Sequence, residues 1–225
     1  MKSDLGSKAI TGLCRPIISI MPAHKTYIET HLGSGEVMRR KPPALENIAI
    51  DRDLNVLKTF RCDYTVKKIY CCAHQFLKTY DFKGYELVYC DPPYLLYTRN
   101  LVPRYRFDYK EKDHIELLEL IKKLPCSVII SGHPTKLYDM HLSDWGSLEL
   151  QVTNQVKVWT EKLWFNYALD EHYWARTTGN NALNRYSIKK SAIKWAERYQ
   201  EVSRSERIAL LSSIMAVEAQ ENESQ

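Results

Sequence analysis

The chain has 225 residues, of which 44% are hydrophobic and 26% are charged, a composition typical of a globular protein with a buried core. It excludes a collagen-like or largely disordered chain, and the length favours one fold plus a tail over two full domains. Lysine and arginine total 32 against 27 acidic residues, and the formal charge of +5 is compatible with a polyanionic partner without identifying one.

Short apolar runs alternate with helix-like stretches through the first 132 residues. We expect strands at 26–30, 47–51, 66–72, 86–91 and 126–132. A helix is expected at 112–124, because Ile115, Leu118 and Ile121 recur at helical spacing. This alternation is typical of βαβ units, so it predicts an α/β fold with a parallel sheet covered on both faces.

The pattern changes after the fifth expected strand. Residues 147–153 and 157–167 are two β-rich runs joined by a short polar segment, which predicts an antiparallel hairpin. The predicted sheet is therefore mostly parallel and ends in an antiparallel hairpin.

The chain beyond residue 169 has helical rather than strand patterns. One helix is expected at 188–202, and a second follows Ser203, which has capping-box spacing to Glu206. Residues 176–207 hold eight basic and three acidic side chains, a local charge equal to that of the whole chain. Such a surface suits either a solvated helix face or a nucleic-acid contact. We expect a main domain at 1–169 and a basic helical extension at 170–225 that packs on it.

Two glycines follow the first expected strand. Gly33 and Gly35 allow a sharp turn and a close approach of the backbone to a ligand. Asp51 ends the next strand, 18 residues after Gly33, where a carboxylate can accept both ribose hydroxyls of an adenosine-containing cofactor. The loop lacks the complete phosphate-binding glycine patterns, which disfavours a dinucleotide or a triphosphate.

The run Asp91-Pro92-Pro93-Tyr94 ends the fourth expected strand. Two prolines forfeit two backbone donors, so they are unusual where only structure is needed. Their stiffness would hold the Asp91 carboxylate and the Pro92 carbonyl as two acceptors that converge on one amino group. The Tyr94 ring is then available to stack on a base.

The ordered set YIETHLGSG, NIAID and YCDPPY resembles the amino-methylating DNA methyltransferases, most closely the D12 class of adenine-specific enzymes. The resemblance runs from about Lys8 to Tyr167. It implies the Rossmann-like fold of class I S-adenosylmethionine-dependent methyltransferases, with 1–169 as the catalytic domain. It also implies methyl transfer to N6 of adenine within a short DNA recognition sequence. The enzyme would serve restriction–modification, with a cognate restriction endonuclease, or act as an orphan.

The resemblance assigns roles to individual residues. The catalytic motif comprises Asp91, Pro92, Pro93 and Tyr94. The implied cofactor-binding residues are Lys8, Gly12, Glu29, His31, Leu32, Gly33, Gly35, Asp51 and Asp91. Many relatives have Pro-Phe where this chain has Thr30-His31, so we interpret His31 as one ring replacing another.

Larger D12 enzymes carry a target-recognition domain before the catalytic motif, and this chain has no room for one. The best substitute is residues 97–109, where arginines alternate with aromatic residues, as suits contacts to phosphates, guanines and stacked bases. We expect DNA contacts from Arg99, Arg104, Tyr105 and Arg106. An ordinary polar loop is the alternative interpretation.

Two other functions stay open. Some RNA base amino-methyltransferases resemble this chain at the catalytic motif, and its basic segments would serve either polymer. The chain could instead be a non-catalytic nucleic-acid-binding remnant of the fold. Methylation of a cytosine ring is disfavoured, because it needs a nucleophilic cysteine and the only Pro-Cys pair, Pro125-Cys126, begins an apolar run.

The sequence gives no sign of a metal site or a membrane segment. Its seven histidines and six cysteines are scattered without metal-ligand spacing. The first 22 residues include Asp4, Arg15 and Pro16, whereas a signal peptide needs an unbroken apolar stretch. We therefore expect reduced thiols, no metal and a cytoplasmic protein.

Overall fold

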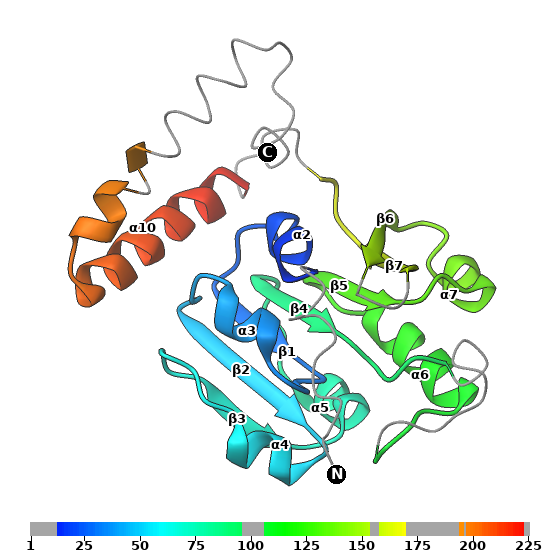
Figure 1. The fold of residues 1–225 in the computed structure, drawn as a ribbon. Coiled ribbons are helices and arrows are strands. Elements are labelled where there is room, and N and C mark those ends of the chain that lie inside the picture. The colour runs from blue at the N-terminus through cyan, green and yellow to red at the C-terminus, as the bar shows by residue number, and fades with distance from the viewer. Residues whose placement is uncertain (1–12, 96–105, 154–157, 170–193, 196, 223–225) are drawn as a thin grey trace.

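The fold is seen in a computed structural model that describes residues 13–95, 106–153, 158–169, 194–195 and 197–222. A seven-stranded sheet has the order β3-β2-β1-β4-β5-β7-β6 (Figure 1). Its strands are β1 (Thr26–Glu29), β2 (Glu46–Asp51), β3 (Lys67–Tyr70), β4 (Glu86–Cys90), β5 (Ser127–Gly132), β6 (Gly146–Thr153) and β7 (Val158–Phe165). The first five pair in parallel, and β7 is antiparallel to both β5 and β6. The predicted fold class, a mostly parallel sheet that ends in an antiparallel hairpin, is confirmed.

Helices cover both faces of the sheet. The described helices include α2 (Cys14–Ser19), α3 (Glu36–Arg40), α4 (Leu54–Thr59), α5 (Ala73–Thr79), α6 (Glu111–Ile121), α7 (Lys136–His141) and α10 (Arg204–Asn222). Buried side chains of α2, α3 and α4 join one apolar cluster, and those of α5, α6 and α7 join a second. Every residue of β1 and β4 is buried, as expected for central strands of a sheet covered on both sides.

The crossover helix α6 is shorter than the predicted 112–124. Its first turn is closed by Asp113, whose side chain accepts from the Lys110 backbone N–H at 2.8 Å. The helix ends at Ile121, and Lys122 reaches across to the end of α7. There its Nζ donates to the His141 carbonyl at 2.9 Å and to Asp144 at 2.8 Å. The basic end of the predicted helix therefore links two helices.

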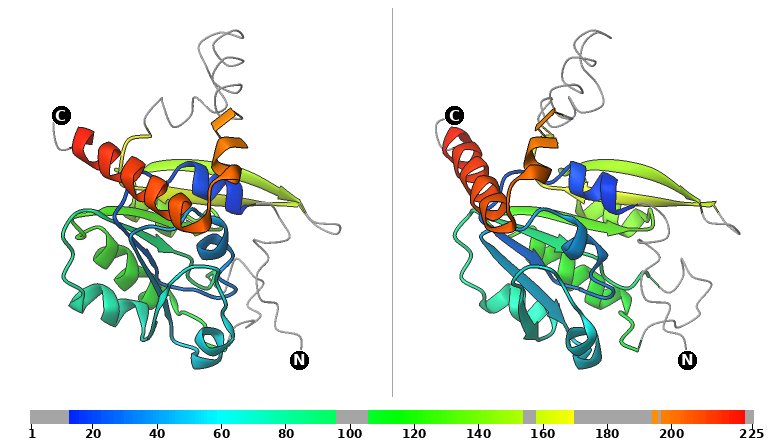
Figure 2. Two further views of the ribbon diagram at one scale, coloured as in Figure 1. Left: turned by 90° about the vertical axis from the view of Figure 1, so that its left-hand side faces the viewer. Right: turned by 60° about the vertical axis from the view of Figure 1, so that its left-hand side comes forward.

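The predicted capping box before the last helix is confirmed. The Ser203 N–H donates to Glu206 at 2.9 Å, and the Glu206 N–H donates to the Ser203 hydroxyl at 3.4 Å. Of the helix predicted at 188–202, the structure describes residues 194–195 and 197–202, and it is helical at 194–195 and 197–201. Within the ranges that the structure describes, no helix is both long and apolar enough to cross a membrane. Figure 2 shows α10, in orange to red, outside the sheet.

An ionisable side chain is buried against the central strand β1. Lys41 is 3% exposed, and its Nζ lies 4.4 Å from the centre of the Tyr27 ring. Burial lowers the pKa of Lys41 to about 7, although the charge of Glu29 opposes this shift. Burial also lowers the pKa of the neighbouring His24 to about 3, with Lys41 adding to the effect. Lys41 is therefore one group through which this part of the core responds to pH above neutrality.

We expect Lys41→Met to remove a rise of stability with pH. Because the folded pKa of Lys41 is about 7 and its ordinary value is 10.5, the unfolded chain binds more protons than the folded chain between these values. The free energy of unfolding then rises with pH in this window, at most by about 1.4 kcal/mol per pH unit. Urea unfolding of both proteins at pH 7, 8 and 9 measures the difference between their free energies of unfolding. Groups that titrate equally in both proteins do not contribute to this difference. Equal slopes would contradict the lowered pKa.

Candidate active site

The site lies at the carboxyl edge of the parallel strands. The chain passes from β1 outward to β2 and β3 and then returns to β4 on the other side of β1, so the loops after β1 and β4 diverge at this point. Such a switch point is where open α/β sheets bind ligands. Two backbone bonds extend the pairing into the loop, from Thr30 N–H to the Tyr89 carbonyl and from Leu32 N–H to the Ile50 carbonyl, both at 3.0 Å.

The glycine loop and Asp51 meet at this edge, as the sequence predicts. Gly33 and Gly35 have φ angles of 50° and 67°, in the left-handed region. The Gly33 N–H donates to Asp51 Oδ2 at 3.0 Å, and the Asp53 N–H donates to Oδ1 at 2.7 Å. Burial raises the pKa of the Asp51 carboxyl, although these two backbone donors oppose the shift. The carboxylate is therefore held against the loop by main-chain groups.

The other predicted cofactor residues have different surroundings. Leu32 is 2% exposed and packs in the core. Glu29 is 3% exposed and accepts from the Tyr27 hydroxyl at 3.1 Å. His31 lies between two hydroxyls, with Nδ1 2.8 Å from Thr30 Oγ1 and Nε2 2.9 Å from the Tyr109 oxygen. Lys8 and Gly12 lie outside the described residues.

Asp91 is fixed by a neighbouring strand. The Ser131 hydroxyl, at the end of β5, donates to Asp91 Oδ1 at 3.1 Å. Behind it, the Tyr89 hydroxyl lies 2.9 Å from the same serine oxygen. Ser131 is 0% and Tyr89 1% exposed, so this chain of hydrogen bonds is shielded from water. It defines the orientation of the Asp91 carboxylate before any ligand arrives.

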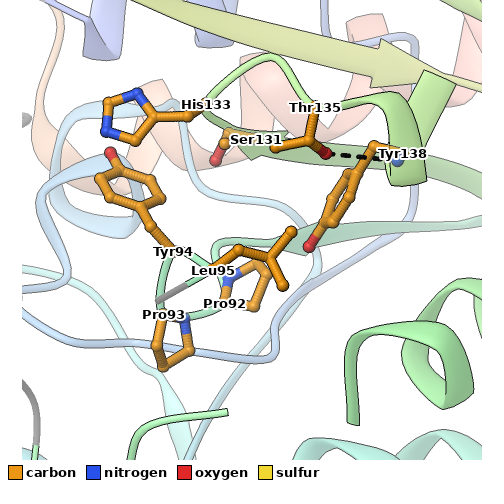
Figure 3. Close-up of a pocket in the computed structure, with 9 residues that line it drawn as sticks. Pro92, Pro93, Tyr94, Leu95, Ser131, His133, Thr135 and Tyr138 are labelled. Carbon is orange, nitrogen blue, oxygen red and sulfur yellow. Dashed lines mark hydrogen bonds between the residues drawn. The ribbon is translucent and has the colours of Figure 1, made fainter. Parts of the chain in front are cut away.

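A small hollow opens beside Asp91. It is lined by Pro92, Pro93, Tyr94, Leu95, Ser131, Gly132, His133, Thr135 and Tyr138. Figure 3 shows Tyr94 and Tyr138 on opposite sides of this space, with Leu95 and Pro92 between them. Its volume is about 10 Å³, which is room for a single water molecule. A flat base can therefore enter only when a lining side chain moves.

The Tyr94 side chain is held from β7. Its hydroxyl donates to the Glu161 carboxylate, with oxygen distances of 3.2 and 3.0 Å. Its ring centre lies 4.2 Å from that of His133, at 45° between the planes. No sequence motif includes Ser131, His133 or Glu161, so none of the three was predicted. Glu161 reaches this edge only through the antiparallel pairing of β7 with β5.

The segment after the catalytic motif ends beside Asp51. Arg106 is exposed, and its guanidinium lies 3.7 Å from the Asp53 carboxylate. The Arg52 guanidinium lies 4.8 Å from the centre of the Phe107 ring. Arg99, Arg104 and Tyr105, the other predicted DNA contacts, lie outside the described residues. The structure therefore describes only the carboxyl end of the predicted basic loop, residues 106–109, and this end lies next to the glycine loop.

Two of the buried cysteines are poor nucleophiles. Cys90 is fully buried and Cys126 is 6% exposed, and burial raises the pKa of each thiol to about 12. Neither forms a thiolate at neutral pH. Among the described side chains, no group of three histidine, cysteine or acidic residues is arranged to hold a metal ion.

Solved structures similar to this chain include several methyltransferases. A SAM-dependent methyltransferase from Agrobacterium tumefaciens has 10% identity and a TM-score of 0.47; the match covers 68% of this chain and 59%, less than two thirds, of that one. TrmK from M. capricolum, solved with S-adenosyl-homocysteine, has 9% identity and a TM-score of 0.45, over 92% of this chain and 95% of that one. An rRNA methylase from Streptococcus thermophilus has 9% identity and a TM-score of 0.46, over 69% and 94%.

No protein-family model and no curated protein matches the sequence. The fold class therefore rests on the strand order itself. Five parallel strands, with the chain crossing between β1 and β4 and β7 inserted antiparallel between β5 and β6, give the Rossmann-like arrangement expected from the sequence.

Substitution of the two loop glycines should have unequal effects on stability. A Cβ at Gly35 would collide with the Phe60 ring, whereas one at Gly33 meets no atom within 4 Å. Gly33→Ala therefore costs only the left-handed backbone penalty of about 1 kcal/mol. Gly35→Ala adds an overpacking cost and should lower the free energy of unfolding by about 3 kcal/mol. Urea unfolding of the two variants compares them, and equal losses would contradict the close packing at Gly35.

Proposed function

We propose that this chain is an S-adenosylmethionine-dependent methyltransferase that methylates N6 of adenine in DNA. The observation that carries the proposal is the Asp91-Pro92-Pro93-Tyr94 run at the switch point, with its carboxylate oriented by Ser131. It supplies two acceptors for an amino group and an aromatic ring next to them. Residues 1–169 are the proposed catalytic domain, and 170–225 the proposed basic extension packed on it.

The residues at the neighbouring loop fit the cofactor. Asp51 ends β2 as a carboxylate that can accept ribose hydroxyls, and the Gly33 N–H already holds it against the glycine loop. Gly35 brings the backbone close to Phe60, where a side chain would not fit. When bound, S-adenosylmethionine supplies an electrophilic methyl group. The roles that the resemblance gives to Lys8, Gly12, Glu29, His31 and Leu32 are part of this proposal.

The protein's own groups act on the amino group of the base. An adenine in a duplex must first be flipped out, which costs a few kcal/mol of unstacking. Tyr94 stacks on the extruded ring. Asp91 and the Pro92 carbonyl each accept a hydrogen bond from the amino group. These two bonds localise the nitrogen lone pair as the nitrogen becomes tetrahedral. Asp91 is also placed to take the proton that the nitrogen loses. Positioning of the two reactants supplies much of the remaining acceleration.

The assignment to DNA is supported by the resemblance to the D12 class over most of the chain, and RNA is the alternative substrate. Arg99, Arg104, Tyr105 and Arg106 are proposed as contacts to the polymer. A short recognition sequence, a cytoplasmic location and a restriction endonuclease as partner belong to the same proposal.

The decisive experiment measures transfer of radiolabelled methyl from S-adenosylmethionine to unmethylated plasmid DNA and, in parallel, to total RNA. Chromatography of the digested nucleosides should reveal N6-methyldeoxyadenosine. Asp91→Ala should lower the rate at least about 1,000-fold, because it removes an acceptor that acts in the transition state. Cofactor affinity, measured by calorimetry, should fall far less than the rate, because Asp91 is only one of several proposed cofactor contacts. Label in RNA alone would replace the DNA assignment, and retained turnover in Asp91→Ala would overturn the mechanism.

Ser131→Ala tests the orientation of Asp91. Without the serine hydroxyl one carboxylate oxygen loses its donor, and kcat should fall about tenfold, the value of one hydrogen bond to a charged group. Ser127→Ala, on the same strand, is the matched control and should keep full activity. Equal rates for the two variants would show that Asp91 needs no support from β5.

A further inference from the structure

We infer that Glu161 is a positioning residue that fixes the ring of Tyr94 for stacking on the target base. This inference rests on the proposed function and adds to it a residue of the antiparallel hairpin, far in sequence from the catalytic motif.

The contact itself is specific. Both carboxylate oxygens of Glu161 lie within hydrogen-bond distance of the Tyr94 hydroxyl, at 3.2 and 3.0 Å. Glu161 is 0% exposed, so the carboxylate is kept from water and its bond to the hydroxyl is stronger than a solvated one. A carboxylate is costly to bury unless it is hydrogen-bonded, and the Tyr94 hydroxyl is one donor that offsets this cost.

The strand β7 holds the neighbouring ring as well. His133 Nδ1 lies 3.2 Å from the carbonyl oxygen of Thr160, the residue before Glu161. A carbonyl can only accept, so Nδ1 carries the proton. The Tyr94 and His133 rings, with centres 4.2 Å apart, are thus held by adjacent groups of one strand. Figure 3 shows the two rings together at one side of the hollow.

This arrangement leaves the face of the Tyr94 ring to contact the target base. Since the Tyr94 hydroxyl donates its hydrogen to Glu161, it has no hydrogen left to donate to the base, and Tyr94 offers the base the face of its ring. The bond also restricts rotation of the ring, so less conformational entropy is lost when a base stacks on it. Stacking of one base on an aromatic side chain is the kind of contact that affects binding of the polymer more than binding of a small cofactor.

The test compares Glu161→Gln with the control variant Glu149→Gln. Glu149 is an exposed carboxylate on the same hairpin, and its charge pairs with Lys162. Both changes remove one negative charge without loss of volume. With plasmid DNA, or with RNA where RNA is the substrate, Glu161→Gln should lower kcat/KM for the polymer about tenfold, since a charge-assisted bond becomes a neutral one. The Kd for S-adenosylmethionine and the thermal midpoint should stay within error of wild type, and Glu149→Gln should behave as wild type.

A double-mutant cycle separates positioning from a general structural effect. Tyr94→Phe keeps the ring and removes the hydroxyl, so it should lose at least as much as Glu161→Gln, which only weakens the bond. The double variant should lose no more than Tyr94→Phe alone, because the bond that Glu161→Gln weakens is already absent there. Additive losses, or a Glu161→Gln rate equal to that of Glu149→Gln, would overturn the inference while the proposed function stands. A wild-type protein that methylates neither polymer would overturn the proposed function and the inference together.

Discussion

Parallel pairing of β1 with β2 on one side and β4 on the other is the constraint on which the rest of the site depends. It brings the carboxyl ends of three strands to one edge, with the chain diverging between β1 and β4. The glycine loop, Asp51 and Asp91 therefore lie at the same edge although they are distant in sequence. Successive side chains of β1 and β4 alternate between the two apolar clusters, so a register shift of one residue would move each side chain into the cluster on the opposite face, where the packing does not match it.

Local sequence patterns predicted the fold. They also predicted the part of the site whose residues directly follow the parallel strands. Asp51 and Gly33 could be placed together because each follows a buried parallel strand, and the structure joins them by a hydrogen bond. Glu161 could not be predicted in the same way. It meets Tyr94 across 67 residues of sequence because β7 is inserted between β5 and β6, a choice of pairing that no local pattern encodes.

His31 illustrates how a substitution within a motif changes the chemistry of its surroundings. The sequence allowed the interpretation that one ring replaces another. In the structure both ring nitrogens are engaged, by Thr30 and by Tyr109. Tyr109 is 2% exposed and belongs to the segment that follows the catalytic motif. The polar ring thus ties the loop after β1 to that segment, a connection that an apolar ring could make only by packing.

Asp91, the proposed acceptor, and Tyr94, the proposed stacking group, are supported from different strands: Asp91 by Ser131 on β5 and Tyr94 by Glu161 on β7. The motif follows β4, and its two prolines limit backbone freedom but leave both side chains free to rotate. Hydrogen bonds from the neighbouring strands remove that remaining freedom. A side chain that is already oriented loses less conformational entropy when a ligand binds. This smaller entropy loss depends on the pairing of β5 with β7. The antiparallel end of the sheet is therefore part of the site's preorganisation as well as of the fold.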